Sequence, residues 1–525
     1  MTSVSLLSST APLAADAVIV ATVSTPAGVA LASGAAPVDE ALGGVLLAAL
    51  QAVGATGKPD EVIKIPTLGK STTPLIVATG LGNGAADTLE TESVRRAVGA
   101  ALRALSHGRV TVAIGDGTDS GLVEAISDGV LLGGYRFTKY KSSSRNAAAG
   151  KSTSSKSTSS KSMAGKSIAS KSIASNEGVQ RVDICVADAA DARSRAALRR
   201  SKIITTAVNN TRDLVNTPAN DLNPVTFAAY AKEQGEAAGL SVEVLDERAL
   251  KRGGFGGILG VGGGSATPPR LVRLSYQPAR AKSSVALIGK GITFDSGGLD
   301  LKMVLMAQMK SDMAGAAAVV ESVIAAAKLR LPVAVTATVP MAENAVSGTA
   351  YRPSDVLVMR DGSTVEVDNT DAEGRLILAD AMLRACEDSP DFLIETSTLT
   401  GGQMIALGTE MVGAMGSDEF RDRVVAAGTG SGESLWPMPL PPRLRASLDS
   451  PVADIVNVSK DRWASMLLAG IFLQNYVPDG LDWVHLDIAG PAFATSAGGY
   501  NQRGGTGAIV RTIVATLTDI AQNGS

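Results

Sequence analysis

The sequence predicts an α/β protein with two domains. A chain of 525 residues is longer than one hydrophobic core usually organises, so we expect two folding units. Hydrophobic residues make up 45% of the chain and charged residues 19%, which is typical of a globular protein. In both halves short apolar runs alternate with Ala-rich stretches of helical character, and this pattern favours sheets flanked by helices.

The predicted N-terminal domain, residues 1–195, is an α/β layer with one low-complexity segment. Its strand candidates are four apolar runs, at residues 17–23, 74–79, 110–114 and 182–187. Residues 141–178 carry a K-S-x-x-x repeat that starts at Lys151 and is rich in Ser, Lys and Ala. Such a composition buries too little apolar surface to offset its ordering entropy, so it predicts a disordered loop. A tether for a polyanion or another partner is the functional alternative.

The predicted C-terminal domain spans residues 196–525, and a helical stretch at 190–215 links the two domains. Its pattern is typical of a mostly buried sheet between helices. Strand candidates are residues 241–245, 271–276, 284–288, 332–339, 391–396 and 483–488; helix candidates are residues 224–238, 309–329, 376–387, 466–476 and 507–520. The Gly-rich residues 253–264 lack a clear preceding strand, so they indicate a flexible turn more than a dinucleotide-binding loop.

Composition excludes several classes of function. The two cysteines, Cys185 and Cys386, form neither a disulfide framework nor a thiolate zinc site, and the two histidines, His107 and His485, do not form an H-E-x-x-H motif. Acid–base or metal chemistry would therefore rest on Asp, Glu, Lys and Arg. A net charge of −3 gives no reason to expect a nucleic-acid partner. Because neither a signal peptide nor a membrane span is evident, we expect a cytoplasmic protein.

Three segments of the second half concentrate charged side chains next to predicted strands and helices, where an α/β sheet commonly has its site. Residues 285–302 and 309–318 form the first two, and residues 366–376 the third. In the third segment the charges alternate, and alternate residues of an extended strand point the same way. We therefore expect Asp371, Glu373 and Arg375 to converge. The candidate site residues of the other two segments are Lys290, Asp295, Lys302 and Asp312.

Carboxylates that converge repel one another unless cations neutralise them, and hard oxygen ligands suit Mg, Mn or Zn. A lysine among them can bind a metal only if its amine is neutral. Arg375 and the backbone N–H groups of the helix that follows it would form a cradle for an anion. Each residue alone also has a structural explanation, because Asp312 or Asp371 could cap a helix and a lysine could be a surface charge.

Several ordered motifs resemble the leucyl (cytosol) aminopeptidase family. Residues 369–376 (NTDAEGRL) are similar to the family's signature octapeptide, and residues 289–302 (GKGITFDSGGLDLK) to its second motif. Family-like segments also occur at 212–218 (RDLVNTP), 340–344 (PMAEN), 398–401 (TLTG) and 485–491 (HLDIAGP). The resemblance covers roughly residues 205–520, whereas the first half resembles the family's variable N-terminal domain only in outline.

The resemblance implies a role for each converging residue. Two divalent ions per subunit, Mn or Zn, would be held by Lys290, Asp295, Asp312, Asp371 and Glu373. Lys302 and Arg375 would be the catalytic residues, with a bicarbonate on Arg375 carrying the proton. A water bridging the two metals would attack the scissile carbonyl of a peptide with a free N-terminus. The resemblance also implies a homohexamer.

One segment departs from the family pattern. Met303 stands where the family usually has a proline, and the stretch between Lys302 and Asp312 is one residue shorter. Met306 and Met309 match a methionine pair whose second member lines the pocket for the first substrate side chain. The resemblance therefore does not fix leucine as the preferred residue. A dipeptidase of narrow specificity, such as a cysteinylglycinase, and a DNA-binding relative without peptidase activity are the alternative functions.

Overall fold

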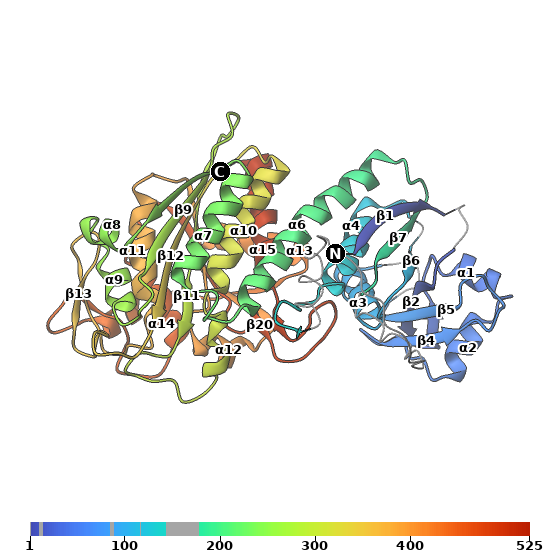
Figure 1. Ribbon diagram of the computed structural model, residues 1–525, viewed down its shortest axis with the longest axis horizontal. Coiled ribbons are helices and arrows are strands. Elements are labelled where there is room, and N and C mark those ends of the chain that lie inside the picture. Colours follow the sequence, from blue (N-terminus) through green and yellow to red (C-terminus); the bar gives the residue numbers. More distant parts are fainter. Residues whose placement is uncertain (1, 10–13, 85–88, 116, 143–177, 525) are drawn as a thin grey trace, which may run out of the picture. The chain divides into compact units, whose positions relative to one another are not determined.

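A computed structural model describes residues 2–9, 14–84, 89–115, 117–142 and 178–524. The chain divides into two compact units, Met1–Ser194 and Arg195–Ser525, and each has its own sheet (Figure 1). The predicted α/β fold with two domains is confirmed, while the domain boundary placed after residue 195 stays a prediction. The predicted disordered loop at 141–178 lies almost entirely outside the described residues.

Among the described residues, the first unit contains a mixed sheet of seven strands in the order β1-β7-β6-β2-β5-β4, with β3 paired to β2. Along this order, neighbouring strands from β1 to β5 are parallel. β4 is antiparallel to β5, and β3 is antiparallel to β2. The strands are β1 (Ser3–Ser8), β2 (Ala17–Thr25), β3 (Gly28–Leu31), β4 (Val62–Pro66), β5 (Leu75–Asn83), β6 (Arg109–Ala113) and β7 (Arg181–Val186). The helices are α1 (Ala36–Ala41), α2 (Leu46–Ala52), α3 (Thr91–Arg103) and α4 (Ser120–Gly133), and α6 (Ala192–Asn216) continues into the second unit.

The described part of the second unit is built on a mixed sheet of nine strands in the order β17-β16-β19-β15-β10-β12-β9-β8, with β11 paired to β12. Its centre, from β19 to β12, is parallel, as buried apolar strands favour. The strands are β8 (Ser241–Leu245), β9 (Arg270–Tyr276), β10 (Ser284–Gly289), β11 (Gly291–Asp295), β12 (Ala334–Asn344), β15 (Phe392–Ser397), β16 (Met411–Gly416), β17 (Ser434–Pro437) and β19 (Asp482–Asp487). Smaller sheets contain β13 (Val356–Val358), β14 (Thr364–Glu366), β18 (Ile455–Val456), β20 (Phe493–Ala494) and β21 (Gly504–Gly505).

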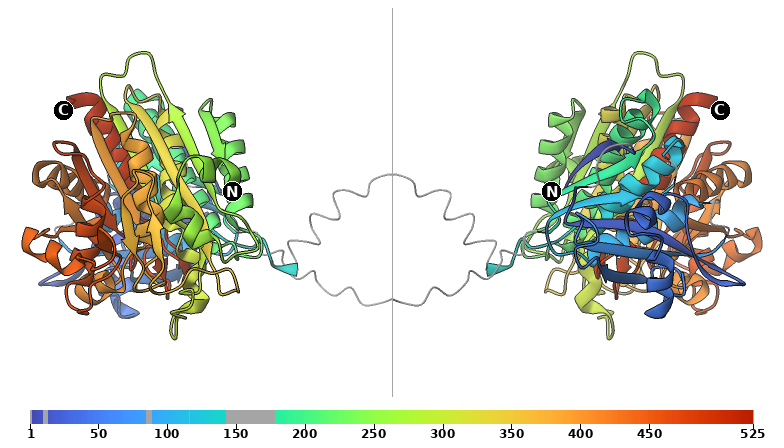
Figure 2. Two further views of the ribbon diagram at one scale, coloured as in Figure 1. Left: turned by 90° about the vertical axis from the view of Figure 1, so that its left-hand side faces the viewer. Right: turned by 90° about the vertical axis from the view of Figure 1, so that its right-hand side faces the viewer.

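Helices cover both faces of this sheet. One side carries α7, α10 and α15, and the other carries α9, α11 and α14; Figure 2 gives two further sides of the same layers. A large apolar core lies between the sheet and α11, and includes Ile288, Leu376, Leu393 and Phe472. The bounds are α7 (Pro224–Ala237), α8 (Glu247–Arg252), α9 (Gly256–Gly262), η1 (Met306–Ser311), α10 (Ala314–Leu329), α11 (Gly374–Cys386), α12 (Gly401–Leu407), α13 (Asp418–Ser431), η2 (Pro442–Leu448), α14 (Ser465–Gln474) and α15 (Val510–Asn523).

Helix α10 packs on the sheet at backbone distance because small residues line the contact. A Cβ atom on Gly315 would lie 2.2 Å from the carbonyl oxygen of Thr396 in β15. A Cβ atom on Gly289, at the end of β10, would lie 2.6 Å from the carbonyl oxygen of Gly315. Both positions therefore require glycine, and the start of α10 is held directly against the carboxyl ends of β10 and β15.

Two local predictions were wrong. The helix expected over 309–329 begins at Ala314, because Met313, with φ −118° and ψ 12°, interrupts it after the 3-10 turn η1. The Gly-rich residues 253–264 were expected to be a flexible turn at a packed helix end; they do begin at the end of α8, but most of them form helix α9. Here the glycines provide close packing, since Cβ atoms on Gly256 and Gly257 would lie 1.9 Å and 2.3 Å from the carbonyl oxygens of Val358 and Leu376.

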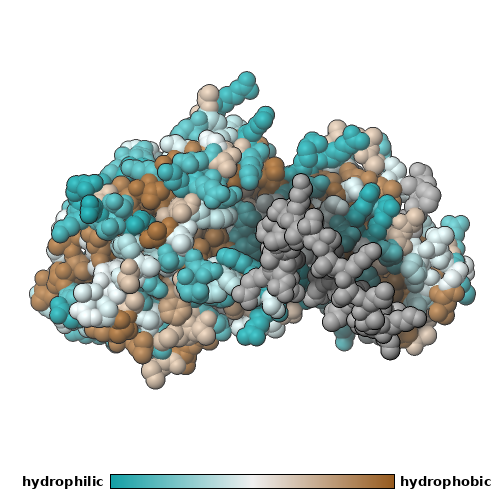
Figure 3. Space-filling model, viewed as in Figure 1, coloured by the Kyte–Doolittle hydropathy of each residue, from teal (hydrophilic) through white to brown (hydrophobic). Residues whose placement is uncertain are grey.

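The surface of the face drawn in Figure 3 mixes hydrophilic residues with smaller hydrophobic areas. Within the described ranges no helix is both long and apolar enough to cross a lipid bilayer.

Candidate metal centre

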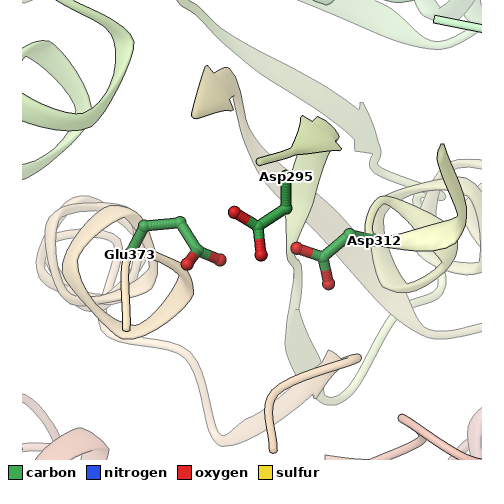
Figure 4. Close-up of side chains that lie close together, drawn as sticks. All are labelled: Asp295, Asp312 and Glu373. Carbon is green, nitrogen blue, oxygen red and sulfur yellow. The ribbon is translucent and has the colours of Figure 1, made fainter. Parts of the chain in front are cut away.

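Three buried carboxylates meet at the carboxyl end of the central parallel strands. Asp295 ends β11, Asp312 lies between η1 and α10, and Glu373 directly precedes α11. One carboxylate oxygen from each lies within 4.8 Å of the other two, and the side chains point toward one another (Figure 4). Segments separated by many residues therefore bring three potential metal ligands to one point.

Lys290 joins this cluster. It follows β10 directly and is 3% exposed. Its Nζ atom lies 2.8 Å from Oδ2 of Asp312 and 2.8 Å from Oε1 of Glu373, and it donates a hydrogen bond of 3.0 Å to the carbonyl oxygen of Thr398. A glycine makes room for it, because a Cβ atom on Gly374 would lie 2.4 Å from Cε and 2.7 Å from Nζ of Lys290.

Lys302 and Asp371 form the more open side of the centre. Nζ of Lys302 lies 2.7 Å from Oδ2 of Asp295 and 2.5 Å from Oδ1 of Asp371. The side chain of Asp371 is 35% exposed and that of Lys302 is 17% exposed, whereas the carboxylates deeper in the site are almost inaccessible. Lys302 therefore lies between the buried carboxylates and the solvent.

The predicted alternation of Asp371, Glu373 and Arg375 along an extended strand is wrong. Asp371 lies in a turn, Glu373 has helical dihedral angles (φ −75°, ψ −35°), and Arg375 belongs to the first turn of α11. A turn followed by a helix start directs Glu373 into the carboxylate cluster. Arg375 instead extends to another segment, where its Nη1 donates a hydrogen bond of 2.6 Å to the carbonyl oxygen of Asn457.

The charges of the centre shift one another's pKa. Burial and the neighbouring acids Asp295 and Glu373 raise the pKa of Asp371 to about 6. Burial also raises the pKa of Asp312 and of Glu373. For Lys290 burial opposes the charge, but the carboxylates of Asp312, Glu373 and Asp295 outweigh it and raise the pKa. Lys290 is therefore an ammonium group among these carboxylates, and it would have to lose its proton to bind a metal ion. Burial lowers the pKa of Arg375 to about 10.

The donor set fits divalent cations. Several oxygen ligands and two amines lie around one buried point, and like-charged carboxylates so close together need positive charge among them. Oε2 of Glu373 is buried and has no hydrogen-bond partner in the described parts of the chain, so it offers a lone pair to a cation. In the same parts Nε of the buried Arg375 also lacks a partner, which leaves a donor for an anion beside the cation site.

Neutral polar residues that were not predicted from the sequence surround the charged ones. Nδ2 of Asn344 donates hydrogen bonds of 2.9 Å to Oδ1 of Asp295 and to the carbonyl oxygen of Thr370. The Thr370 hydroxyl donates to the carbonyl oxygen of Gly297, and the Tyr351 hydroxyl donates to the carbonyl oxygen of Thr370. Asn344 and Thr370 both lie inside the family-like motifs, so their position was the available signal. Tyr351 had none.

His485 lies fully buried in β19 beside Glu395 of β15, with Nδ1 bonded to the Glu395 carboxylate. Burial disfavours its charged form, but Glu395 outweighs burial and raises the pKa of His485. Asp487, two residues further along β19, accepts a hydrogen bond of 2.7 Å from the Thr400 hydroxyl. The buried pair of His485 and Glu395 thus joins the neighbouring strands β19 and β15.

Comparisons with known proteins cover both units. The model of the cytosol aminopeptidase family's catalytic domain matches residues 209–514, and the model of that family's N-terminal domain matches residues 19–144. A probable cytosol aminopeptidase of Rhodococcus jostii is 48% identical over 512 residues, which are 97% of this chain and 95% of the relative. A probable cytosol aminopeptidase of Nocardia farcinica is 49% identical over 479 residues, which are 91% of this chain and 88% of the relative.

Solved structures agree with the sequence comparison. The bottromycin maturation enzyme BotP in complex with Mn has a TM-score of 0.79 at 32% identity, and the match covers 97% of this chain and all of the other. A mutant of tomato leucine aminopeptidase has a TM-score of 0.81 at 28% identity, with 99% of this chain and 97% of the other covered.

Proposed function

Because this chain belongs to the cytosol aminopeptidase family and is a metal-dependent aminopeptidase, we propose that two divalent ions per subunit are held by Lys290, Asp295, Asp312, Asp371 and Glu373. The observation that carries this proposal is the buried meeting point of Asp295, Asp312 and Glu373. Oε2 of Glu373, which has no hydrogen-bond partner in the described parts of the chain, supports ion binding in the buried part of the centre. The exposed side chain of Asp371 supports substrate binding on the solvent side. Mn²⁺ and Zn²⁺ both suit such ligands, and BotP has been solved in complex with Mn.

Divalent ions bound there would supply Lewis acidity toward the scissile carbonyl and would lower the pKa of a bound water. The chain's own residues then have three tasks. The carboxylates of Asp295, Asp312, Asp371 and Glu373 would offset the charge of the two ions. Lys302, on the open side, donates N–H groups toward the oxygen on which negative charge develops. Arg375 would hold a bicarbonate through its unpartnered Nε, and such an anion would supply a proton acceptor beside the reacting groups.

A panel of aminoacyl anilides and dipeptides, assayed on metal-stripped protein with Mn²⁺ or Zn²⁺ added back, tests the proposal. We expect release of N-terminal residues from several substrates, only with metal, and two ions per subunit by elemental analysis. Cleavage of cysteinylglycine alone would show the narrow dipeptidase instead. Metal-independent cleavage would contradict the assignment of the metal ligands.

The family membership also supports a cytoplasmic homohexamer, which we propose as the working state of the protein. Light scattering on the purified full-length chain tests this assembly, and a monomeric active species would refute it.

A further inference from the structure

A small sheet places Asn457 beside the loop that carries Asp371. In this sheet β14 pairs antiparallel with β13 and parallel with β18, so that Glu366 lies opposite Val456. The next residue, Asn457, continues the ladder, because its N–H donates a hydrogen bond of 3.0 Å to the carbonyl oxygen of Glu366. Asn457 therefore lies beside the end of β14, where the chain continues into residues 368–372.

The side chain of Asn457 is fully buried and bonded to the backbone of that loop. Its Oδ1 accepts hydrogen bonds from the N–H groups of Asp368 (2.8 Å) and Asn369 (3.3 Å). Its Nδ2 donates to the carbonyl oxygens of Asn369 (2.7 Å) and Ala372 (3.4 Å). One amide thus satisfies backbone groups on both sides of Asp371, and the directions of these groups fix which end is the oxygen.

The same residue also holds Arg375. The carbonyl oxygen of Asn457 accepts the hydrogen bond of 2.6 Å from Nη1 of Arg375, while Nε of Arg375 stays unpartnered. Asn457 therefore contacts the loop of Asp371 through its side chain and the guanidinium group of Arg375 through its backbone. A buried hydrogen-bond network of this kind keeps its members in one arrangement only while all of its groups are paired.

We propose that Asn457 is a positioning residue of the metal centre. Its amide holds the 368–372 loop so that Asp371 and Glu373 face the ions, and its carbonyl oxygen orients Arg375 for the anion. This inference rests on the proposed function, since it concerns the same ions. Groups that orient metal ligands from outside the ligand set typically change metal affinity or activity by about 10–100-fold when they are replaced.

The test measures Mn²⁺ binding by isothermal titration calorimetry on the metal-stripped, full-length chain, together with kcat, KM and the melting temperature. Asn457→Asp keeps the acceptor for Asp368 and Asn369 but loses the donors to Asn369 and Ala372. We expect its Kd for Mn²⁺ to rise about 10–100-fold and kcat to fall by a similar factor, with KM changing little. Asn457→Ala, which loses both sets of bonds, should show at least as large an effect.

Asn223→Ala is the matched control. Asn223 also accepts hydrogen bonds from two backbone N–H groups, those of Val225 and Thr226, but it caps α7 outside the centre. Its loss should lower the melting temperature and leave Kd and kcat unchanged. If Asn457→Asp binds Mn²⁺ as tightly as the unmodified chain, or if Asn223→Ala weakens binding as much, the inference is wrong.

The remaining outcomes are also decisive. If neither Asn457 variant folds, the residue is a folding determinant and the inference fails. If the unmodified chain binds Mn²⁺, Asn457→Asp weakens that binding and no peptide is cleaved, the positioning role stands while the proposed function fails. If the unmodified chain binds no divalent ion, both are overturned.

Discussion

Replacing Gly374 with alanine separates the geometry of the centre from the stability of the fold. Gly374 is the first residue of α11, and in a helix alanine is favoured over glycine by about 1 kcal/mol. Without further contacts the substitution would therefore leave stability unchanged or raise it. The added Cβ, however, would lie 2.4 Å from Cε and 2.7 Å from Nζ of Lys290.

The size of the effect follows from these contacts. Ordinary carbon–carbon contacts are about 3.5–4.0 Å, so the end of Lys290 has to move by about 1 Å. Lys290 is buried, with its ammonium group 2.8 Å from both Asp312 and Glu373, so this movement disturbs the two carboxylates. A misplacement of about 1 Å costs roughly 100-fold in rate, which corresponds to about 2.7 kcal/mol of transition-state stabilisation.

The assay compares kcat/KM on the best aminoacyl anilide, the Mn²⁺ content and the melting temperature of Gly374→Ala and Gly430→Ala. Gly430 lies in helix α13, and a Cβ atom there would meet nothing within 4 Å. We expect Gly430→Ala to keep full activity and Gly374→Ala to lose about 100-fold with its fold intact. If folded Gly374→Ala binds metal and turns over within threefold of the unmodified chain, the position of Lys290 does not control the centre.

Four further predictions concern charge and the low-complexity segment. Glu373→Gln should abolish metal retention and turnover together, and a variant that keeps its ions by elemental analysis would remove Glu373 from the ligand set. Lys302→Met should keep the ions but lower kcat by about 100–1,000-fold, as for loss of an oxyanion donor, and an unchanged kcat would exclude that role. Deletion of residues 151–175 should leave kcat/KM unaltered, and a folded but inactive product would assign the segment a catalytic contribution. Burial raises the pKa of Asp380 to about 7, so between about pH 4 and 7 the folded protein binds a proton that the unfolded chain releases, and this group makes the free energy of unfolding fall as pH rises. In urea unfolding, Asp380→Asn should therefore become more stable relative to the unmodified chain as pH rises through this window; a constant difference would contradict the shift.

The second half of the chain was predictable because its strands are buried on both faces. β10 (SVALIG) is a nearly continuous apolar run and β15 (FLIETS) begins with one, and the sequence predicts both within a residue or two. In the first unit β4 (VIKIP) alternates between half-buried and exposed residues, and α4 contains glycines that resemble turn signals. These elements are stabilised by tertiary contacts and carry little local signal.

At the metal centre, residue type and position in the sequence indicated the charged residues but not the neutral residues that hydrogen-bond around them. Lys290 stands out because it directly follows an apolar strand, and charged residues are rarely fully buried. Asp312 stands out less, because acids are common at helix starts. Asn457 contacts Arg375 across 82 positions of sequence, and an isolated asparagine in an irregular segment has no distinguishing pattern. The alternation along 371–375 was right that Asp371 and Glu373 face the centre, but a turn and a helix start, and not a strand, direct Glu373 inward. Arg375 extends to Asn457 instead.

The glycine contacts between α10 and the sheet set the distance between this helix and the ends of β10 and β15. Asp312 stands two residues before Ala314, so its distance from Asp295 and Glu373 depends on how closely the backbone of Gly315 rests on the ends of β10 and β15. A single methyl group at Gly289 or Gly315 would lift the helix and widen the gap between the carboxylates. We therefore expect the spacing of the carboxylates to depend on the contact between α10 and the sheet, as well as on the ligands themselves.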